Sequence, residues 1–241
     1  MNKKSVQIKK VVPAYETGPD DRMHCHWLMN HMQEAATLHA DTLGIGVNDL
    51  AKSGQMWVLT SMRIGIEELP RREEEFELTT WSRGVKRLRA FREFSGCDAN
   101  GRERIRASSE WMVLDEATRK PIVINPDFNF YAQDKCVFQN AMKRLRPGTP
   151  EKEIRTLTVG YSSLDANGHV NNAEYLRWSF DGLRPMGLDQ NEIKSIRIAF
   201  LSEVFEGNII KLMSCNCSDD GFELIGFNET ENRAAFALKI E

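Results

Sequence analysis

The sequence predicts an α+β fold made of two tandem units, each a curved antiparallel β-sheet wrapped around one central α-helix. Three observations support this prediction. A strand, a helix and then several strands follow one another twice within the 241 residues. Strands that directly follow one another are separated by turn residues, which is typical of antiparallel sheets. The second helix is apolar around most of its circumference, so it is expected to lie enclosed by other elements.

The first half supplies the first set of elements. A strand-like stretch passes through Val11 and Val12 and leads to a polar turn at residues 20–24. A helix follows, because apolar residues recur at helical spacing from Leu28 to Leu43, and Gly44 ends it. Later strands are predicted at 57–66, 75–83, 89–97 and 104–114, with turns at Gly84 and at Asn100-Gly101.

The second half repeats this order. A strand at 154–161 precedes a helix at 172–183, and further strands are predicted at 193–200, 208–217, 222–227 and 233–240, with a turn at 219–221. Ser61-Met-Arg-Ile-Gly-Ile66 and Ser195-Ile-Arg-Ile-Ala-Phe200 stand at the same place in the two halves, which indicates an internal duplication. We therefore predict a double hotdog fold with units at 1–129 and 153–241, joined by a linker at 130–152.

Composition excludes several classes of function. The net charge is only −3, so the chain has no general attraction to nucleic acid or to membrane surfaces. No apolar run reaches the roughly 20 residues needed to span a bilayer. The N-terminus lacks a secretory signal and the five cysteines form no CxxC pair, so reduced thiols in the cytoplasm are expected. Cys215 and Cys217 would face the same way, but no partners for a zinc site are found, and no metal is predicted.

Polar side chains concentrate in the segment Leu164-Asp-Ala-Asn-Gly-His-Val-Asn-Asn-Ala-Glu-Tyr-Leu176. One interpretation is purely structural. Asp, Asn and Gly are common turn residues, Asn171 or Asn172 suits the N-cap of the second helix, and Glu174 has capping-box spacing from Asn171. The other interpretation is a catalytic site, and spacing alone does not separate the two.

The position of His169 just before the helix favours the catalytic interpretation. The first amides of a helix carry partial positive charge, so those of Val170, Asn171 and Asn172 are candidate donors to an oxyanion. His169 can transfer protons near neutral pH, and Asn167 offers an amide donor and acceptor. Asp165 is expected to orient the imidazole. Together these groups predict a hydrolytic site that needs neither a metal nor another cofactor.

The first half serves as an internal comparison. Its turn reads Asp20-Asp-Arg-Met-His24, so arginine stands where the second half has asparagine. The repeat also places Leu69 at the position of Glu203. We therefore predict that the second half performs the chemistry and the first shapes a pocket. Structural or surface roles are expected for His24, His26, His31 and His39.

The sequence resembles the acyl-acyl carrier protein (acyl-ACP) thioesterases, of the bacterial type related to the plant plastid enzymes. The resemblance covers nearly the whole chain and rests on residues 165–178, 196–203 and 81–92. It implies a double hotdog fold and hydrolysis of fatty acyl-ACP thioesters, which ends acyl chain elongation. Asp165, Asn167 and His169 match the catalytic motif of the family, and Glu203 matches a carboxylate proposed to act on water. Plant members often place cysteine after that glutamate, whereas this chain has Val204, which favours direct attack by water.

The resemblance also implies a partner, the acyl carrier protein bearing a fatty acyl-phosphopantetheine. A basic run is the candidate docking surface for this acidic protein, although a solvated hairpin would explain it equally: Arg83, Lys86, Arg87, Arg89 and Arg92. Apolar residues of the first half are candidates for an acyl pocket, although each also suits an ordinary core: Trp27, Leu28, Met32, Ala35, Ala36, Met56, Trp57 and Leu59. The chain is expected to be a monomer or a homodimer.

Three alternatives remain open. An acyl-CoA thioesterase would use its basic residues to meet nucleotide phosphates. A hotdog dehydratase would use histidine and a carboxylate on a hydroxyacyl substrate. A non-catalytic module would bind acyl thioesters without releasing a thiol. Within the thioesterase interpretation, either Glu203 or His169 can be the general base.

Overall fold

The chain divides into two units, residues 1–142 and 143–241, in a computed structural model that describes residues 3–140, 142–143, 145–215 and 221–241. The predicted linker is shared between them. Its first part packs on the first unit: Trp81 Nε1 donates to Lys135 O at 2.8 Å, and the Arg63 guanidinium lies 4.0 Å from the centre of the Phe138 ring. Its last residues open the first strand of the second unit, β7 (Pro150–Thr158).

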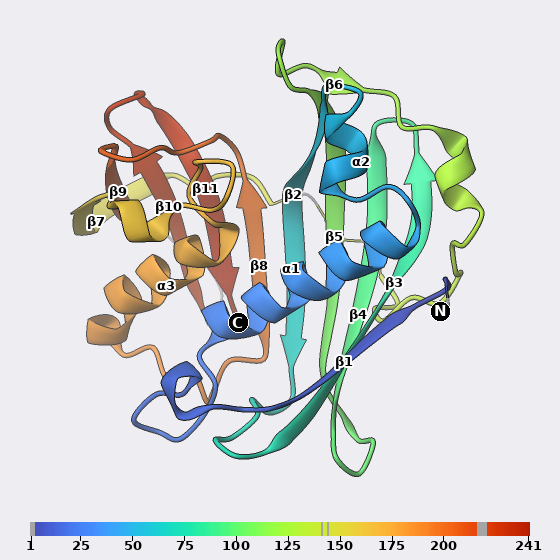
Figure 1. The fold of residues 1–241 in the computed structure, drawn as a ribbon. Coiled ribbons are helices and arrows are strands. Elements are labelled where there is room, and N and C mark those ends of the chain that lie inside the picture. Colours follow the sequence, from blue (N-terminus) through green and yellow to red (C-terminus); the bar gives the residue numbers. More distant parts are fainter. Residues whose placement is uncertain (1–2, 141, 144, 216–220) are drawn as a thin grey trace. The chain divides into compact units, whose positions relative to one another are not determined.

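The first unit is an antiparallel sheet with strand order β1-β3-β4-β5-β2, and short β6 pairs with β5 (Figure 1). Its strands are β1 (Val6–Val11), β2 (Gln55–Ile66), β3 (Glu75–Lys86), β4 (Arg89–Asp98), β5 (Glu103–Asp115) and β6 (Pro121–Ile122). Its helices are α1 (Cys25–Thr42) and α2 (Val47–Ala51), with 3-10 turns at Ala14–Glu16 and Pro126–Asn129. Helix α1 crosses one face of this sheet (Figure 1).

The core of the first unit lies between α1 and the sheet. Leu28, Met32 and Ala35 recur at helical spacing on α1 and are fully buried. The strands supply the opposite side, since Ala107 stands between Ile64 and Phe94 in the register of β2, β5 and β4, and all three are at most 1% exposed. Burying both faces together stabilises the helix in the curve of the sheet.

The second unit repeats the arrangement with strand order β8-β11-β10-β9-β7 (Figure 1). Its elements after β7 are a 3-10 turn (Tyr161–Ser163), α3 (Asn172–Leu183), a 3-10 turn (Arg184–Met186), β8 (Ser195–Phe200), β9 (Ile209–Cys215), β10 (Phe222–Asn228) and β11 (Arg233–Ile240). A Cβ on Gly182 would approach Ile154 and Leu212 to 3.3 and 3.2 Å. This glycine therefore lets α3 pack closely on β7 and β9.

The structure confirms the α+β fold and the repeated hotdog arrangement. One predicted turn is wrong: β3 continues through Gly84, which has φ +89° and marks a register shift against β4. Arg83, the residue without a partner in the register, and Gly84 form a β-bulge, and the chain reverses after Lys86 instead. The sequence analysis did not predict α2 and β6, which are short. The predicted turn at 219–221 lies mostly outside the described residues, as does Cys217. No helix in the described ranges is long and apolar enough to cross a membrane.

Candidate active site

A tight polar loop precedes α3. Leu164 and Val170 form an antiparallel bridge, and Asp165 N donates to His169 O at 2.7 Å. Gly168 N returns a bond to Asp165 O at 3.0 Å, and Gly168 has φ +75°, a conformation that glycine adopts without strain. These bonds place His169 at a fixed point directly before the helix.

The Asp165 carboxylate braces this loop. Its Oδ1 accepts the main-chain N–H of Asn167 at 2.8 Å and of His169 at 3.2 Å. Its Oδ2 lies 3.4 Å from Asn167 Nδ2. We expected Asp165 to orient the imidazole directly, whereas these bonds position His169 through its main chain.

The structure brings His169 and Glu203 together. Val170 N donates to Val204 O at 3.0 Å, and this bond ties the loop before α3 to the segment after β8. His169 Nδ1 then lies 3.7 Å from Glu203 Oε1, and the two side chains are 15% and 31% exposed. This separation is longer than a hydrogen bond, so the pair is partly shielded but not locked together.

Two aromatic side chains border this pair. The Phe205 ring stands edge-on to the His169 ring, with 5.1 Å between their centres and an angle of 83°. Tyr175 is 3% exposed, and burial, followed by the negative charges of Asp165 and Glu203, raises the pKa of its phenol. The Tyr175 phenol therefore stays neutral, and the Phe205 ring is an apolar neighbour of His169.

The start of α3 differs from the expected oxyanion site. Val170 N donates to Val204 O, and Asn171 N donates to Ser163 O at 2.9 Å. Ala173 N donates at 2.9 Å to the side chain of Asn171, which is the N-cap and one of the two predicted candidates. Two of the three predicted donors, Val170 and Asn171, are thus already bonded within the protein, because the same amides hold the loop in place.

The first unit contains the same loop ahead of α1. Gly18 N donates to Arg22 O at 2.9 Å, and Met23 N donates to Pro70 O at 2.8 Å. These bonds repeat the two that frame the polar loop of the second unit. The match makes Arg22 the counterpart of His169.

This pattern corrects the alignment of the two turns. The comparison of the two halves of the sequence paired residues 20–24 with residues 165–169. The matching main-chain hydrogen bonds instead pair residues 18–22 with residues 165–169, which is a shift of two positions. His24 is the N-cap residue of α1, where Asn171 caps α3. The counterparts of Asp165, Asn167 and Glu203 are Gly18, Asp20 and Leu69, respectively. The first unit therefore lacks both the histidine and the glutamate of the pair.

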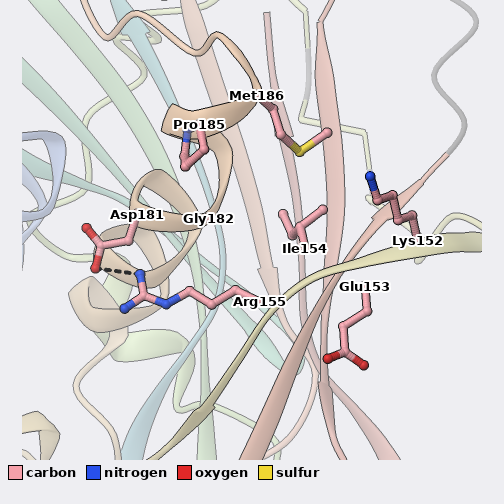
Figure 2. Close-up of a pocket in the computed structure, with 8 residues that line it drawn as sticks. All are labelled: Lys152, Glu153, Ile154, Arg155, Asp181, Gly182, Pro185 and Met186. Carbon is pink, nitrogen blue, oxygen red and sulfur yellow. Dashed lines mark ion pairs between the residues drawn. The ribbon is translucent and has the colours of Figure 1, made fainter.

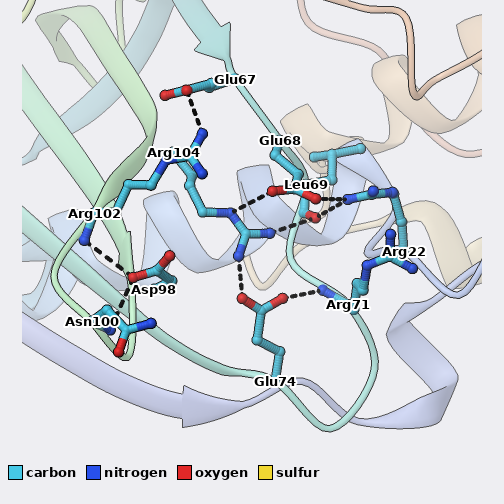
Figure 3. Close-up of polar contacts among 10 residues, drawn as sticks. All are labelled: Arg22, Glu67, Glu68, Leu69, Arg71, Glu74, Asp98, Asn100, Arg102 and Arg104. Atoms are coloured by element: carbon cyan, nitrogen blue, oxygen red, sulfur yellow. Dashed lines mark hydrogen bonds and ion pairs between the residues drawn. The ribbon is translucent and has the colours of Figure 1, made fainter.

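An ion-pair network occupies this region of the first unit (Figure 3). Arg22 donates to Glu68 at 3.0 Å and to Leu69 O at 2.8 Å. Arg104, which is 7% exposed, also donates to Leu69 O, at 2.9 Å, and pairs with Glu74. The network suits a structural role because its guanidinium groups are held by carboxylates and a carbonyl.

The prediction that Arg92 belongs to the docking surface is wrong. Arg92 is only 8% exposed, and it donates to His39 Nδ1 at 2.8 Å and to Thr80 Oγ1 at 3.2 Å. Burial lowers the pKa of Arg92 to about 10. Burial and the charge of Arg92 lower the pKa of His39 to about 4, so His39 stays neutral and accepts this bond.

The other four basic residues lie on or beside the β3–β4 turn and are exposed: Arg83, Lys86, Arg87 and Arg89. Arg83 pairs with Glu93 and Arg89 with Glu110, each at 3.1 Å. The exposed part of the predicted docking surface is therefore the tip of one hairpin.

The predicted acyl-pocket residues do not share one surface. Five are buried in the first unit: Leu28, Met32, Ala35, Ala36 and Leu59. Trp27 instead packs edge-on against Tyr15, and Trp57 packs on the cluster of Leu50, Val113 and Ile124 near α2. Met56 faces the opposite side of β2 from Trp57 and Leu59, because strand side chains alternate.

A separate pocket of about 340 Å³ lies between β7 and the end of α3 (Figure 2). It is lined by Lys152, Glu153, Ile154, Arg155, Asp181, Gly182, Pro185 and Met186. Arg155 and Asp181 form an ion pair of 2.8 Å at its edge. None of the predicted site residues lines it. Within the described ranges, no three His, Cys, Asp or Glu side chains are grouped to hold a metal ion.

Comparison with known families agrees with this arrangement. Residues 3–131 match the acyl-ACP thioesterase N-terminal domain, and residues 148–240 match the acyl-ACP thioesterase C-terminal domain. The chain belongs to the acyl-ACP thioesterase family. The two matched domains correspond to the two units of the fold.

Relatives of this family are found in plants and bacteria. The chain is 26% identical over 228 residues to a chloroplastic acyl-acyl carrier protein hydrolase of Cuphea viscosissima, covering 88% of this chain and 55% of that protein. It is 24% identical to oleoyl-acyl carrier protein thioesterase 1 of Arabidopsis thaliana, covering 90% and 65%. The chain thus spans 55% and 65% of the length of these two plant proteins.

Solved structures share the fold. An acyl-ACP thioesterase from Bacteroides thetaiotaomicron has a TM-score of 0.90 and 26% identity, covering 99% of this chain and 97% of that one. The 12:0-ACP thioesterase from Umbellularia californica has a TM-score of 0.84 and 22% identity, covering 98% and 94%. The double hotdog fold of the family is therefore the fold of this chain.

Proposed function

We propose that this protein hydrolyses the thioester between a fatty acyl chain and the phosphopantetheine of acyl carrier protein, releasing free fatty acid and holo-carrier protein. The single observation that carries the proposal is the pairing of His169 with Glu203 at 3.7 Å, in the unit that matches the C-terminal domain of the family. The first unit has arginine and leucine at these positions, so we assign the reaction to the second.

The 3.7 Å between His169 Nδ1 and Glu203 Oε1 is too long for a direct hydrogen bond, but one water molecule lying beside the pair can bond to both atoms. In the proposed reaction the water oxygen attacks the thioester carbonyl carbon while its proton passes to Glu203 or His169. Either residue can serve as the base in this geometry. The tetrahedral intermediate then breaks its C–S bond, and the leaving thiolate takes up the proton.

Charge develops on the carbonyl oxygen in this step. The exposed side-chain amide of Asn167 is the proposed donor to that oxygen, because the amides of Val170 and Asn171 are already bonded. The positive end of the α3 dipole adds a favourable field. Asp165 supports the reaction by keeping Asn167 and His169 in one rigid loop.

The carrier protein would dock through the β3–β4 turn, where Lys86 and Arg87 are exposed. A basic tip can steer an acidic protein toward the enzyme. We place the reaction in the cytoplasm, where thiols such as the four free cysteines of the described residues stay reduced. The chemistry proposed for the second unit uses only the side chains of the chain and needs no cofactor.

Matched substrates test this proposal. The same fatty acyl chain is presented on acyl carrier protein and on coenzyme A, and thiol release is measured with wild-type protein. We expect a higher kcat/KM for the carrier-protein substrate. A higher value for the coenzyme A substrate would favour an acyl-CoA thioesterase, and binding without thiol release would favour a non-catalytic module.

A further inference from the structure

Phe205 lies at the candidate site although nothing in the proposed chemistry uses it. Its ring stands edge-on to the His169 imidazole, with centres 5.1 Å apart, and the side chain is still 38% exposed. The bond from Val170 N to Val204 O fixes the main chain on both sides of this contact. The ring thus rests on the imidazole and is not part of a buried core.

A buried pair of amides holds the turn that carries this ring. Phe205 N donates to Asn208 Oδ1 at 3.0 Å, and Asn208 N donates to Phe205 O at 3.2 Å. Asn228 Nδ2 donates to the same Oδ1 at 2.9 Å, and Asn208 and Asn228 are 7% and 0% exposed. These three hydrogen bonds hold the turn in one conformation, so the Phe205 ring has a fixed position beside the His169 imidazole.

The first unit shows that this turn does not itself require an aromatic residue. Arg71 N donates to Glu74 Oε2 at 2.8 Å, and Glu74 N donates to Arg71 O at 3.2 Å. These bonds repeat the Phe205–Asn208 turn, with arginine at the place of phenylalanine. The same turn forms with either residue, so the phenyl ring at 205 needs another explanation, and its contact with His169 supplies one.

We propose that Phe205 is a positioning residue that holds the His169 imidazole turned toward Glu203. The 3.7 Å gap leaves the imidazole without a direct hydrogen bond to Glu203 that would stop its rotation. An edge-on ring restricts that rotation by contact and by the preferred geometry of ring pairs. The catalytic consequence of this inference rests on the proposed function, because it assumes that His169 handles protons during thioester hydrolysis.

Kinetics test this consequence through a matched series at residue 205. We expect Phe205→Ala to lower kcat about tenfold, because a misplaced catalytic group slows the reaction, and to leave KM within about twofold. Phe205→Tyr keeps the ring and should restore most of kcat, whereas Phe205→Leu should not. In a Glu203→Gln background, Phe205→Ala should cause little further loss. Equal losses in both backgrounds would overturn the positioning role, and so would an unchanged kcat in Phe205→Ala.

A measurement without substrate tests the contact itself. The phenyl ring should shift the NMR resonance of the His169 ring proton on Cε1, which is assigned by its loss in His169→Ala. We expect Phe205→Ala to move this resonance and to leave that of His24 unchanged. An unmoved His169 resonance in a folded variant would overturn the inference. This result can be read even if the wild-type protein hydrolyses no thioester, so failure of the proposed function and failure of this inference are distinguishable.

Discussion

His169 Nδ1 lies 3.7 Å from Glu203 Oε1, and one main-chain hydrogen bond, from Val170 to Val204, joins the two segments that carry them. One residue precedes a helix and the other follows a strand. The fold therefore brings a histidine and a glutamate together from two loops, which a main-chain hydrogen bond holds in register. The Asp165 brace and the α3 N-cap then fix the histidine side of the pair.

Removing the Asp165 carboxylate should loosen the loop that presents His169. In Asp165→Ala, Asn167 N and His169 N lose their shared acceptor, and we expect kcat to fall roughly 10- to 100-fold, since poorly positioned groups are costly. Asp165→Asn retains an oxygen acceptor and should lose less. Steady-state kinetics of the two variants provide the comparison, and equal losses would show that charge, not the brace, is what Asp165 supplies.

Charge reversal at the β3–β4 turn should affect only the carrier-bound substrate. For Lys86→Glu combined with Arg87→Glu, we expect kcat/KM on acyl carrier protein to fall about tenfold at low salt and to be unchanged on a small neutral thioester. Arg102→Glu combined with Arg233→Glu makes the same change in net charge at exposed positions away from this turn and is the matched control. A parallel loss in this control would point to net charge and would contradict a local docking surface.

The buried His39 should make the protein less stable in mild acid. Its pKa is about 4 when folded and 6.5 in the reference state, so between these values the unfolded chain binds a proton that the folded chain excludes. Stability is therefore full above pH 6.5 and falls as the pH drops toward 4, by about 2–3 kcal/mol. Urea unfolding at pH 7 and pH 4.5 measures this change. His39→Gln should show a smaller loss, and an identical loss would mean that other groups cause it.

The ion-pair network of the first unit should contribute to stability and not to catalysis. Arg104 is 7% exposed and faces the carboxylates of Glu68 and Glu74, so Arg104→Met should cost about 3–5 kcal/mol in the free energy of unfolding. Arg102 forms an exposed pair with Glu67, and Arg102→Met should cost less than about 1 kcal/mol. Denaturant unfolding separates the two variants. Similar costs would show that burial of Arg104 is unimportant.

Local sequence patterns predicted much of this fold. Helix α3 begins at Asn172 as expected, because an asparagine cap and an apolar helical repeat are both local signals. Arg92 shows that charge alone does not predict whether a side chain is exposed. It shares one face of β4 with Ala90 and Phe94, so strand alternation would have placed it inside, whereas a count of basic residues placed it on the surface.

The candidate site was predictable in its residues but not in its contacts. The short motif selected His169 and Asn167, while the equal Asp–His spacing at residues 20–24 gave a wrong alignment that only the hydrogen-bond pattern corrects. Phe205 gave no signal, because nothing in a single sequence shows which loop side chain will meet the imidazole. The main-chain hydrogen bonds of Val170 and Asn171 could not be predicted either, because their acceptors, Val204 O and Ser163 O, belong to other segments of the chain.

The most direct test of the central claim is thiol release from fatty acyl carrier protein by wild-type protein, His169→Ala and Glu203→Gln. We expect each variant to lose about 10²- to 10⁴-fold in kcat, as is typical when a general acid–base group is removed. His24→Ala, which changes the N-cap residue of α1 in the first unit, should keep turnover near the wild-type value. Wild-type turnover in His169→Ala would contradict the account.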